Sequence, residues 1–94
     1  MGYRENSKWN EENEIRCLII FKKLKEKNFP HGKQAEYCKN MSGLTNLDTG
    51  NISAKICNYK SIAGINKPSN ASQNTKDTYE KYKNHTVKEL ENLI

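Results

Sequence analysis

Residues 51–61, "NISAKICNYKS", decide how this chain folds. Ile52, Ile56 and Tyr59 follow one another at intervals of four and three residues, which is the spacing of one face of a helix. Polar residues occupy most of the positions between them. The pattern predicts an α-helix whose apolar side packs into a core and whose polar side either faces solvent or contacts a partner.

Three other stretches have helical spacing, and no stretch alternates as a strand would. Residues 10–27 begin with a capping asparagine and acidic residues and end with lysines, which suits the helix dipole. Residues 33–41 form a shorter candidate that ends near Gly43, and residues 76–94 form the last. The sequence therefore predicts an all-α domain of four helices over residues 9–94, preceded by a flexible arm at residues 1–8.

Charge and composition limit the classes of partner. The chain has 94 residues, a net charge of +5 and 34% hydrophobic residues, so we expect one small core and an anionic partner such as nucleic acid or an acidic membrane surface. Residues 49–76 contain Lys55, Lys60, Lys67 and Lys76 and no acidic residue. No apolar run approaches the roughly twenty residues of a membrane span, so we expect no membrane-inserted segment.

Cysteine and histidine usage gives no metal, cofactor or catalytic site. Cys17, Cys38 and Cys57 form no C-x-x-C pair, which indicates reduced thiols in a cytoplasmic protein. His31 and His85 are far apart and lack metal-ligand spacing. We therefore expect a protein that is not an enzyme and holds no metal or cofactor.

Two short helices joined by a tight connection, at residues 33–43 and 49–60, have the local plan of a helix-turn-helix unit. Residues 49–60 would be the recognition helix, because amides pair with adenine, lysine with guanine or phosphate, and serine with either. Asn51, Ser53, Lys55, Asn58 and Lys60 are of these types, and Asn51, Lys55 and Asn58 would lie nearest the bases. The candidate phosphate contacts are Lys60, Lys67, Lys22, Lys25 and Lys33. A solvated helix face would have the same residues, so the pattern alone leaves both readings open.

Three ordered segments resemble a known family. Trp9-Asn10-Glu11-Glu12 is similar to a Trp-Thr-x-Glu-Glu opening, "NISAKICNYKSI" to Ser-Val-x-x-Lys-Leu-x-Asn-Phe-x-Ser-Leu, and "PSNASQNTKDTYEKYKN" to Gly-Leu-Ser-Asn-Ala-Ser before an aromatic helix. The set resembles the N-terminal region ahead of the nuclease domain in bacterial HNH endonucleases and restriction-type proteins, and its opening also resembles Myb-like helical domains. Leu47-Asp48-Thr49 departs from the usual Arg-Thr-Pro, and Ile62-Ala63-Gly64 departs from Leu-Asp-Pro.

The resemblance implies a non-catalytic domain that binds double-stranded DNA, as the targeting region of an HNH endonuclease does, and it implies a nuclease domain or nuclease subunit as a further partner. The alternative is a small phage or mobile-element module that binds a nuclease or defence protein, through the same face or through Tyr79 and Tyr82. A third reading is the recognition domain of a longer endonuclease.

Overall fold

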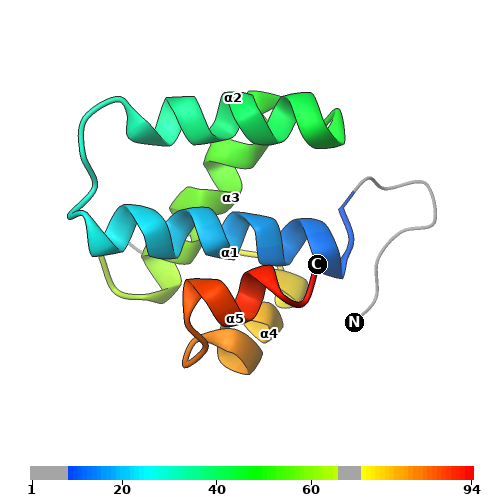
Figure 1. The fold of residues 1–94 in the computed structure, drawn as a ribbon. Helices are drawn as coiled ribbons and strands as arrows, with labels where there is room; N and C mark the ends of the chain where they lie inside the picture. The colour runs from blue at the N-terminus through cyan, green and yellow to red at the C-terminus, as the bar shows by residue number, and fades with distance from the viewer. Residues whose placement is uncertain (1–8, 66–70) are drawn as a thin grey trace.

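The computed structural model describes residues 9–65 and 71–94, and all regular secondary structure in these ranges is helical (Figure 1). The helices are α1 (Glu11–Glu26), α2 (Lys33–Thr45), α3 (Thr49–Ile62), α4 (Gln73–Tyr82) and α5 (Val87–Glu91). The prediction of an all-α fold is confirmed. The N-terminal arm at residues 1–8 and Lys67 lie outside the described residues.

The expected number of four helices is wrong, because residues 76–94 form the end of one helix and the whole of another. α4 begins earlier, at Gln73, and α5 begins after Thr86. The Thr86 hydroxyl accepts a hydrogen bond from the Glu89 backbone N–H, and the Glu89 carboxylate accepts one from the Thr86 N–H. This reciprocal pair is a capping box, which begins a new helix where one continuous helix was expected.

Capping side chains also set the starts of the longer helices. Asn10 accepts from the Asn13 backbone N–H at 2.8 Å, Asp48 from the Asn51 N–H at 3.2 Å, and Ser72 from the Thr75 N–H at 3.3 Å. Each side chain replaces a hydrogen bond that the first turn of a helix lacks. The asparagine cap predicted at the start of residues 10–27 is confirmed.

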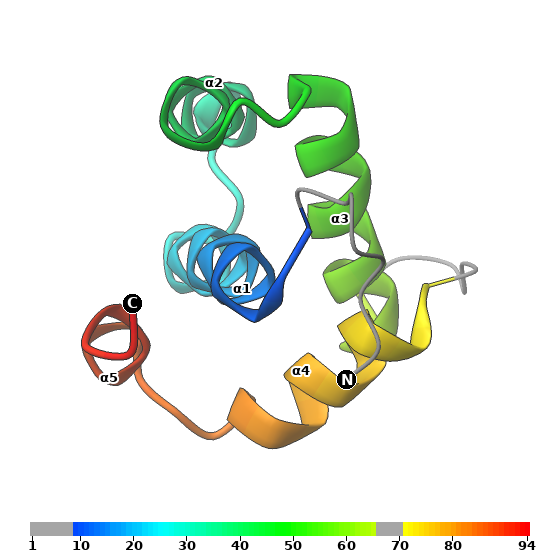
Figure 2. The same ribbon diagram turned by 90° about the vertical axis from the view of Figure 1, so that its right-hand side faces the viewer.

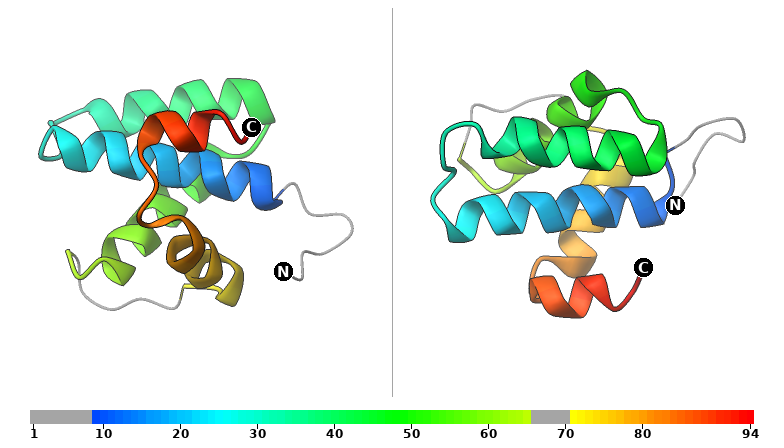
Figure 3. Two further views of the ribbon diagram at one scale, coloured as in Figure 1. Left: turned by 60° about the horizontal axis from the view of Figure 1, so that its bottom comes forward. Right: turned by 45° about the horizontal axis from the view of Figure 1, so that its top comes forward.

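The helices pack around α1, which contacts each of the other four. α1 and α2 lie side by side and antiparallel (Figure 3), and α3 runs across both of them (Figure 2). α5 lies on the side of α1 away from α3, and α4 contacts both α1 and α3 (Figure 2). α1 is therefore the central helix of the fold.

One core joins all five helices. Ile52, Ile56 and Tyr59 are fully buried, which confirms the inward side of α3 that its spacing predicts. The other buried apolar side chains come from every remaining helix and from the connection before α3: Ile15, Cys17, Leu18, Ile19, Ile20, Phe21, Leu24, Cys38, Met41, Leu47, Tyr82 and Leu90.

The connection between α2 and α3 is three residues long. Asn46 has the left-handed conformation, with φ of 63°, and ends α2 by donating its N–H to the Ser42 carbonyl. Leu47 is buried, and its carbonyl accepts a 2.6 Å hydrogen bond from the Ser42 hydroxyl. These two hydrogen bonds join the connection to the last turns of α2. The helix-turn-helix character of this pair stays a prediction.

Candidate nucleic-acid interface

A buried polar cluster lies on the inner side of α3. The Glu14 carboxylate, from a side chain 1% exposed, accepts hydrogen bonds from the Lys55 ammonium group at 2.8 Å and from the Tyr59 hydroxyl at 2.7 Å. Lys55 also donates to the Thr75 hydroxyl at 2.9 Å, and its nitrogen lies 4.5 Å from the centre of the Trp9 ring. The cluster joins α1, α3 and α4, since the Glu14 carboxylate of α1 accepts hydrogen bonds from side chains of both α3 and α4.

This cluster gives Lys55 an internal role that the sequence pattern did not indicate. The pattern assigned Lys55 to DNA bases and Glu14 to the acidic first turn of α1. Glu14 is in fact in line with Cys17, Leu18 and Phe21, three, four and seven residues further on, which are all buried. That spacing was the available signal that Glu14 faces the core. The assignment of Lys55 to base contact remains a prediction, and its ammonium group is held inside the domain.

Lys60 and Ser53 face α2 rather than open solvent. The Lys60 ammonium group donates to the Gln34 side-chain oxygen at 2.8 Å and lies 4.8 Å from the centre of the Phe29 ring. The Gln34 amide in turn donates to the Ser53 hydroxyl at 2.9 Å. Gln34, which the sequence did not single out, therefore connects two of the predicted DNA-contacting residues to α2.

The outer side of α3 is most open in its first two turns. Thr49, Gly50, Asn51 and Ala54 are exposed, whereas Asn58, a turn further on, is half-buried. The backbone N–H of Asn51 is used by the Asp48 cap, and its side chain projects from an exposed position. The surface that α3 presents is thus formed by small and amide side chains near the N-terminal end of the helix.

A groove of about 820 Å³ separates the first half of α2 from the first half of α3, and we call it the α2–α3 groove. It is lined by His31, Gly32, Gln34, Ala35, Cys38, Lys39, Thr49, Gly50 and Ser53. None of these lining residues is acidic, and Lys39 is exposed. The sequence does not predict that His31, Gln34 and Lys39 line this groove. Residue spacing indicates the polar and apolar sides of α2 and of α3, but it does not show which side of one helix packs near the other.

The remaining predicted phosphate contacts do not all lie near this groove. Lys33 opens α2 beside it and pairs with Glu36 at 3.3 Å. Lys22 and Lys25 line a different hollow, next to the start of α5, and Lys22 donates to the Lys83 carbonyl at 2.7 Å. Partial burial lowers the pKa of Lys22 from its ordinary value. Of the predicted contacts, Ser53 lines the α2–α3 groove, whereas Lys22 and Lys25 line a different hollow.

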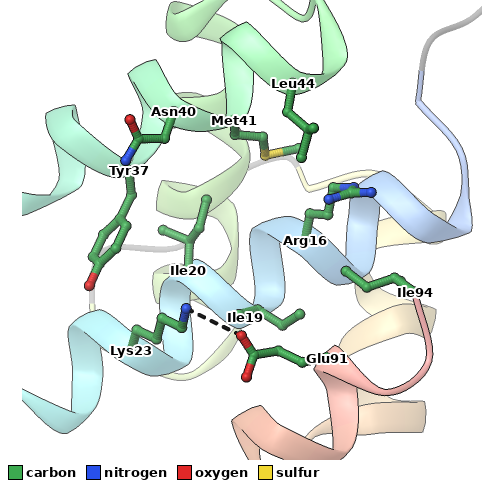
Figure 4. Close-up of a pocket in the computed structure, with 10 residues that line it drawn as sticks. All are labelled: Arg16, Ile19, Ile20, Lys23, Tyr37, Asn40, Met41, Leu44, Glu91 and Ile94. Atoms are coloured by element: carbon green, nitrogen blue, oxygen red, sulfur yellow. Dashed lines mark ion pairs between the residues drawn. The ribbon is translucent and has the colours of Figure 1, made fainter.

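A second groove lies between α1, α2 and the C-terminal residues, and we call it the α1–α2 groove (Figure 4). Ile19, Ile20 and Met41 form its apolar floor, and Leu44 and Ile94 stand at its edges. Leu44 is 66% exposed and Ile94 is 41% exposed. Lys23 and Glu91 form a 3.5 Å ion pair across one side (Figure 4).

The two tyrosines of the alternative prediction are turned toward the core. Tyr82 is 8% exposed, and its hydroxyl donates to the Glu11 carboxylate at 2.7 Å. The Tyr79 ring is half-buried and lies 6.4 Å from the Tyr59 ring, measured between ring centres. Neither side chain presents its full ring to a partner.

Across residues 9–65 and 71–94, no three histidine, cysteine, aspartate or glutamate side chains gather as metal ligands would. None of the helices in these ranges has the length and apolar content to span a bilayer. Comparison of the chain with protein-family models, curated proteins and solved structures finds no match. The resemblance to the targeting regions of HNH endonucleases accordingly stays a prediction that rests on the three quoted segments.

Proposed function

We propose that this chain is a non-catalytic domain that binds double-stranded DNA, with the first half of α3 in the major groove. The observation that carries the proposal is the α2–α3 groove, whose lining has no acidic side chain and which lies beside the exposed start of α3. A DNA-binding surface must accept phosphates at its edges and offer hydrogen-bonding groups to bases at its centre.

The arrangement of α2 and α3 supports the same proposal. Their connection is three residues long, and recognition helices of helix-turn-helix proteins contact bases mainly through their N-terminal residues. On α3 the N-terminal residues are the exposed ones. Asn51 would then be nearest the bases, with Asn58 at the border of the contact.

Lysines at the edge of the α2–α3 groove would contact phosphates. Lys39 is exposed on α2 and lines the groove, and Lys33 begins the same helix. Lys55 would act indirectly, because its bond to Glu14 fixes α3 on α1. It is a positioning residue in this proposal rather than a DNA contact.

A titration of the protein into a fluorescent duplex of about twenty base pairs, followed by anisotropy, tests the proposal. We expect binding at low salt, and the logarithm of the association constant should fall linearly with the logarithm of salt concentration. A chain that remains unbound at 50 mM salt and micromolar concentration would contradict the proposal.

The α1–α2 groove favours a second candidate function, the binding of another protein. An apolar floor with an exposed leucine and isoleucine at its edges suits apolar side chains of a partner. A pull-down against a candidate nuclease or defence protein tests it, with Leu44→Asp as the disrupting variant. Stable capture that is insensitive to salt, combined with no duplex binding, would favour this function over DNA binding.

A further inference from the structure

We infer that α3 reads A·T base pairs, with Asn51 contacting adenine and Ala54 contacting the methyl group of thymine. The inference rests on the proposed DNA-binding function and adds the class of base pair that this surface recognises. The inference compares two groups of side chains on α3. Some are exposed and can reach a base edge, and the others are already hydrogen-bonded within the domain.

The lysines of α3 are both engaged inside the protein. The commonest specific base contact is an arginine or lysine on guanine. α3 has no arginine, and its two lysines are Lys55 and Lys60. The Lys55 ammonium group lies 2.8 Å from the Glu14 carboxylate, and that of Lys60 lies 2.8 Å from the Gln34 side-chain oxygen.

Releasing Lys55 toward DNA would be costly. Glu14 is 1% exposed, so withdrawal of its cation would leave a buried carboxylate without a countercharge. Releasing Lys60 would cost less than releasing Lys55, because its partner Gln34 is neutral. It would still lose that hydrogen bond and the contact of its ammonium group with the Phe29 ring, whose centre lies 4.8 Å away. α3 therefore has no readily available lysine or arginine for guanine.

The exposed side chains of α3 match the major-groove edge of an A·T pair instead. The amide of Asn51 has an acceptor and a donor, which match the N6 donor and N7 acceptor of adenine. Ala54 presents a methyl group, which suits the C5-methyl of thymine. Both residues are exposed and lie on adjacent turns of the same helix face.

The separation of the two residues also fits neighbouring base pairs. Three residues of α-helix rise about 4.5 Å along the axis. Successive bases on one DNA strand are about 3.4 Å apart. Asn51 and Ala54 would then contact two consecutive A·T pairs, and not the same base pair.

Competition between two duplexes of equal length tests the inference, one of alternating A·T sequence and one of alternating G·C sequence. We expect the A·T duplex to bind between about five-fold and a hundred-fold more tightly at constant salt. Replacement of adenine by 7-deazaadenine removes N7, and replacement of thymine by uracil removes the methyl group. Each should weaken binding of the natural chain, because both atoms lie in the major groove.

Two variants separate base reading from phosphate contact. In Asn51→Ala the effect of 7-deazaadenine should disappear, and the fold should persist because the Asp48 cap uses the backbone N–H of residue 51. Circular dichroism checks that persistence. Lys39→Ala, the control, should weaken binding to both duplexes by the same factor.

The outcomes distinguish this inference from the proposed function. Salt-dependent binding with equal affinity for the two duplexes would overturn the A·T inference and leave DNA binding standing. A 7-deazaadenine effect that persists in Asn51→Ala would also overturn it. Failure to bind either duplex at low salt would overturn both the inference and the proposed function.

Discussion

The Glu14 carboxylate and the Lys55 ammonium group lie 2.8 Å apart, in a cluster that also receives the Tyr59 and Thr75 hydroxyls. This ion pair joins α1 to α3 across 41 residues of sequence, and Glu14 is 1% exposed. Removal of one partner of a buried ion pair leaves the other charge without compensation, which costs more than the loss of an exposed pair. The stability of the domain should therefore be sensitive to Lys55.

We expect Lys55→Ala to lower the free energy of unfolding by about 3 to 5 kcal/mol, because the buried Glu14 carboxylate would lose its cation. Urea unfolding followed by circular dichroism measures the change. Lys60→Ala is the matched control on the same helix and should cost less, about 2 kcal/mol, since it removes a hydrogen bond to a neutral amide and a ring contact but strands no buried charge. Equal losses in the two variants would contradict the role assigned to the ion pair.

Lys39→Ala should weaken duplex binding and make it less dependent on salt. Each phosphate contact contributes about 0.9 to the slope of log K against log salt, so the slope should become shallower by about that amount. Lys88→Ala is the control, because Lys88 is also exposed but belongs to α5, on the far side of α1 from α3 (Figure 2). If both variants change the slope alike, the α2–α3 groove is not the site of phosphate contact.

Tyr82→Phe should make the domain more sensitive to acid. Hydrogen bonds from the Tyr82 hydroxyl and the Lys81 ammonium group lower the pKa of Glu11 from its ordinary value of 4.5. A carboxylate whose pKa is lower in the folded state stabilises the fold above pH 4.5, and this contribution disappears as the pH falls through the folded pKa.

In Tyr82→Phe the pKa of Glu11 should move up toward 4.5, and acid unfolding should begin at a higher pH. Titration of side-chain carboxyl resonances by NMR measures the pKa values of Glu11 and Glu89 in one experiment. The pKa of Glu89, lowered mainly by the hydrogen bond from the Thr86 backbone, is the internal reference and should not move. An unchanged Glu11 pKa would show that Tyr82 does not hold this carboxylate.

The three thiols should differ in reactivity in the folded protein. Burial raises the pKa of the Cys17 and Cys38 thiols, which reduces the thiolate available for alkylation. Cys57 is half-exposed. Iodoacetamide at pH 8 should therefore modify Cys57 first and reach the other two only in denaturant, as measured by mass spectrometry of peptides. Uniform modification of the folded chain would contradict this order.

Leu44→Asp should abolish any protein complex that uses the α1–α2 groove and leave duplex binding unchanged. Leu44 is 66% exposed at the groove edge, so a charge there opposes docking of an apolar partner without disturbing the core. Ile65→Asp changes another exposed hydrophobic residue, 44% exposed and outside the groove, and serves as the control. Loss of capture in both variants would indicate a nonspecific apolar contact.

Helix positions and caps could be predicted from the sequence because they depend on neighbouring residues. Ile52, Ile56 and Tyr59 mark the inner side of α3 within eight residues, and Asp48 marks its start. The break before α5 was also present in the sequence, as a threonine three residues before Glu89. It was missed because Tyr82, Val87 and Leu90 continue an apolar spacing across the break.

The role of Lys55 could not be predicted in this way. Its position on α3 is polar by local spacing, and only the packing of α3 on α1 shows that Glu14 lies opposite it. The same holds for Gln34, whose contacts with Ser53 and Lys60 join residues 19 and 26 positions apart. Local patterns give the faces of helices, and tertiary contacts determine which polar groups remain available to a partner.

The contact between Thr75 and Glu14 has a consequence for the order of folding. These residues are 61 positions apart, whereas Lys55 and Thr75 are 20 apart. During synthesis, α1, α2 and α3 emerge from the ribosome before α4, so Glu14 and Lys55 meet while one side of their pair is still hydrated. Thr75 can cover this pair only once α4 has docked, and contacts between residues far apart in the sequence form more slowly than local turns. Docking of α4 should therefore be a late step that locks α3 in place.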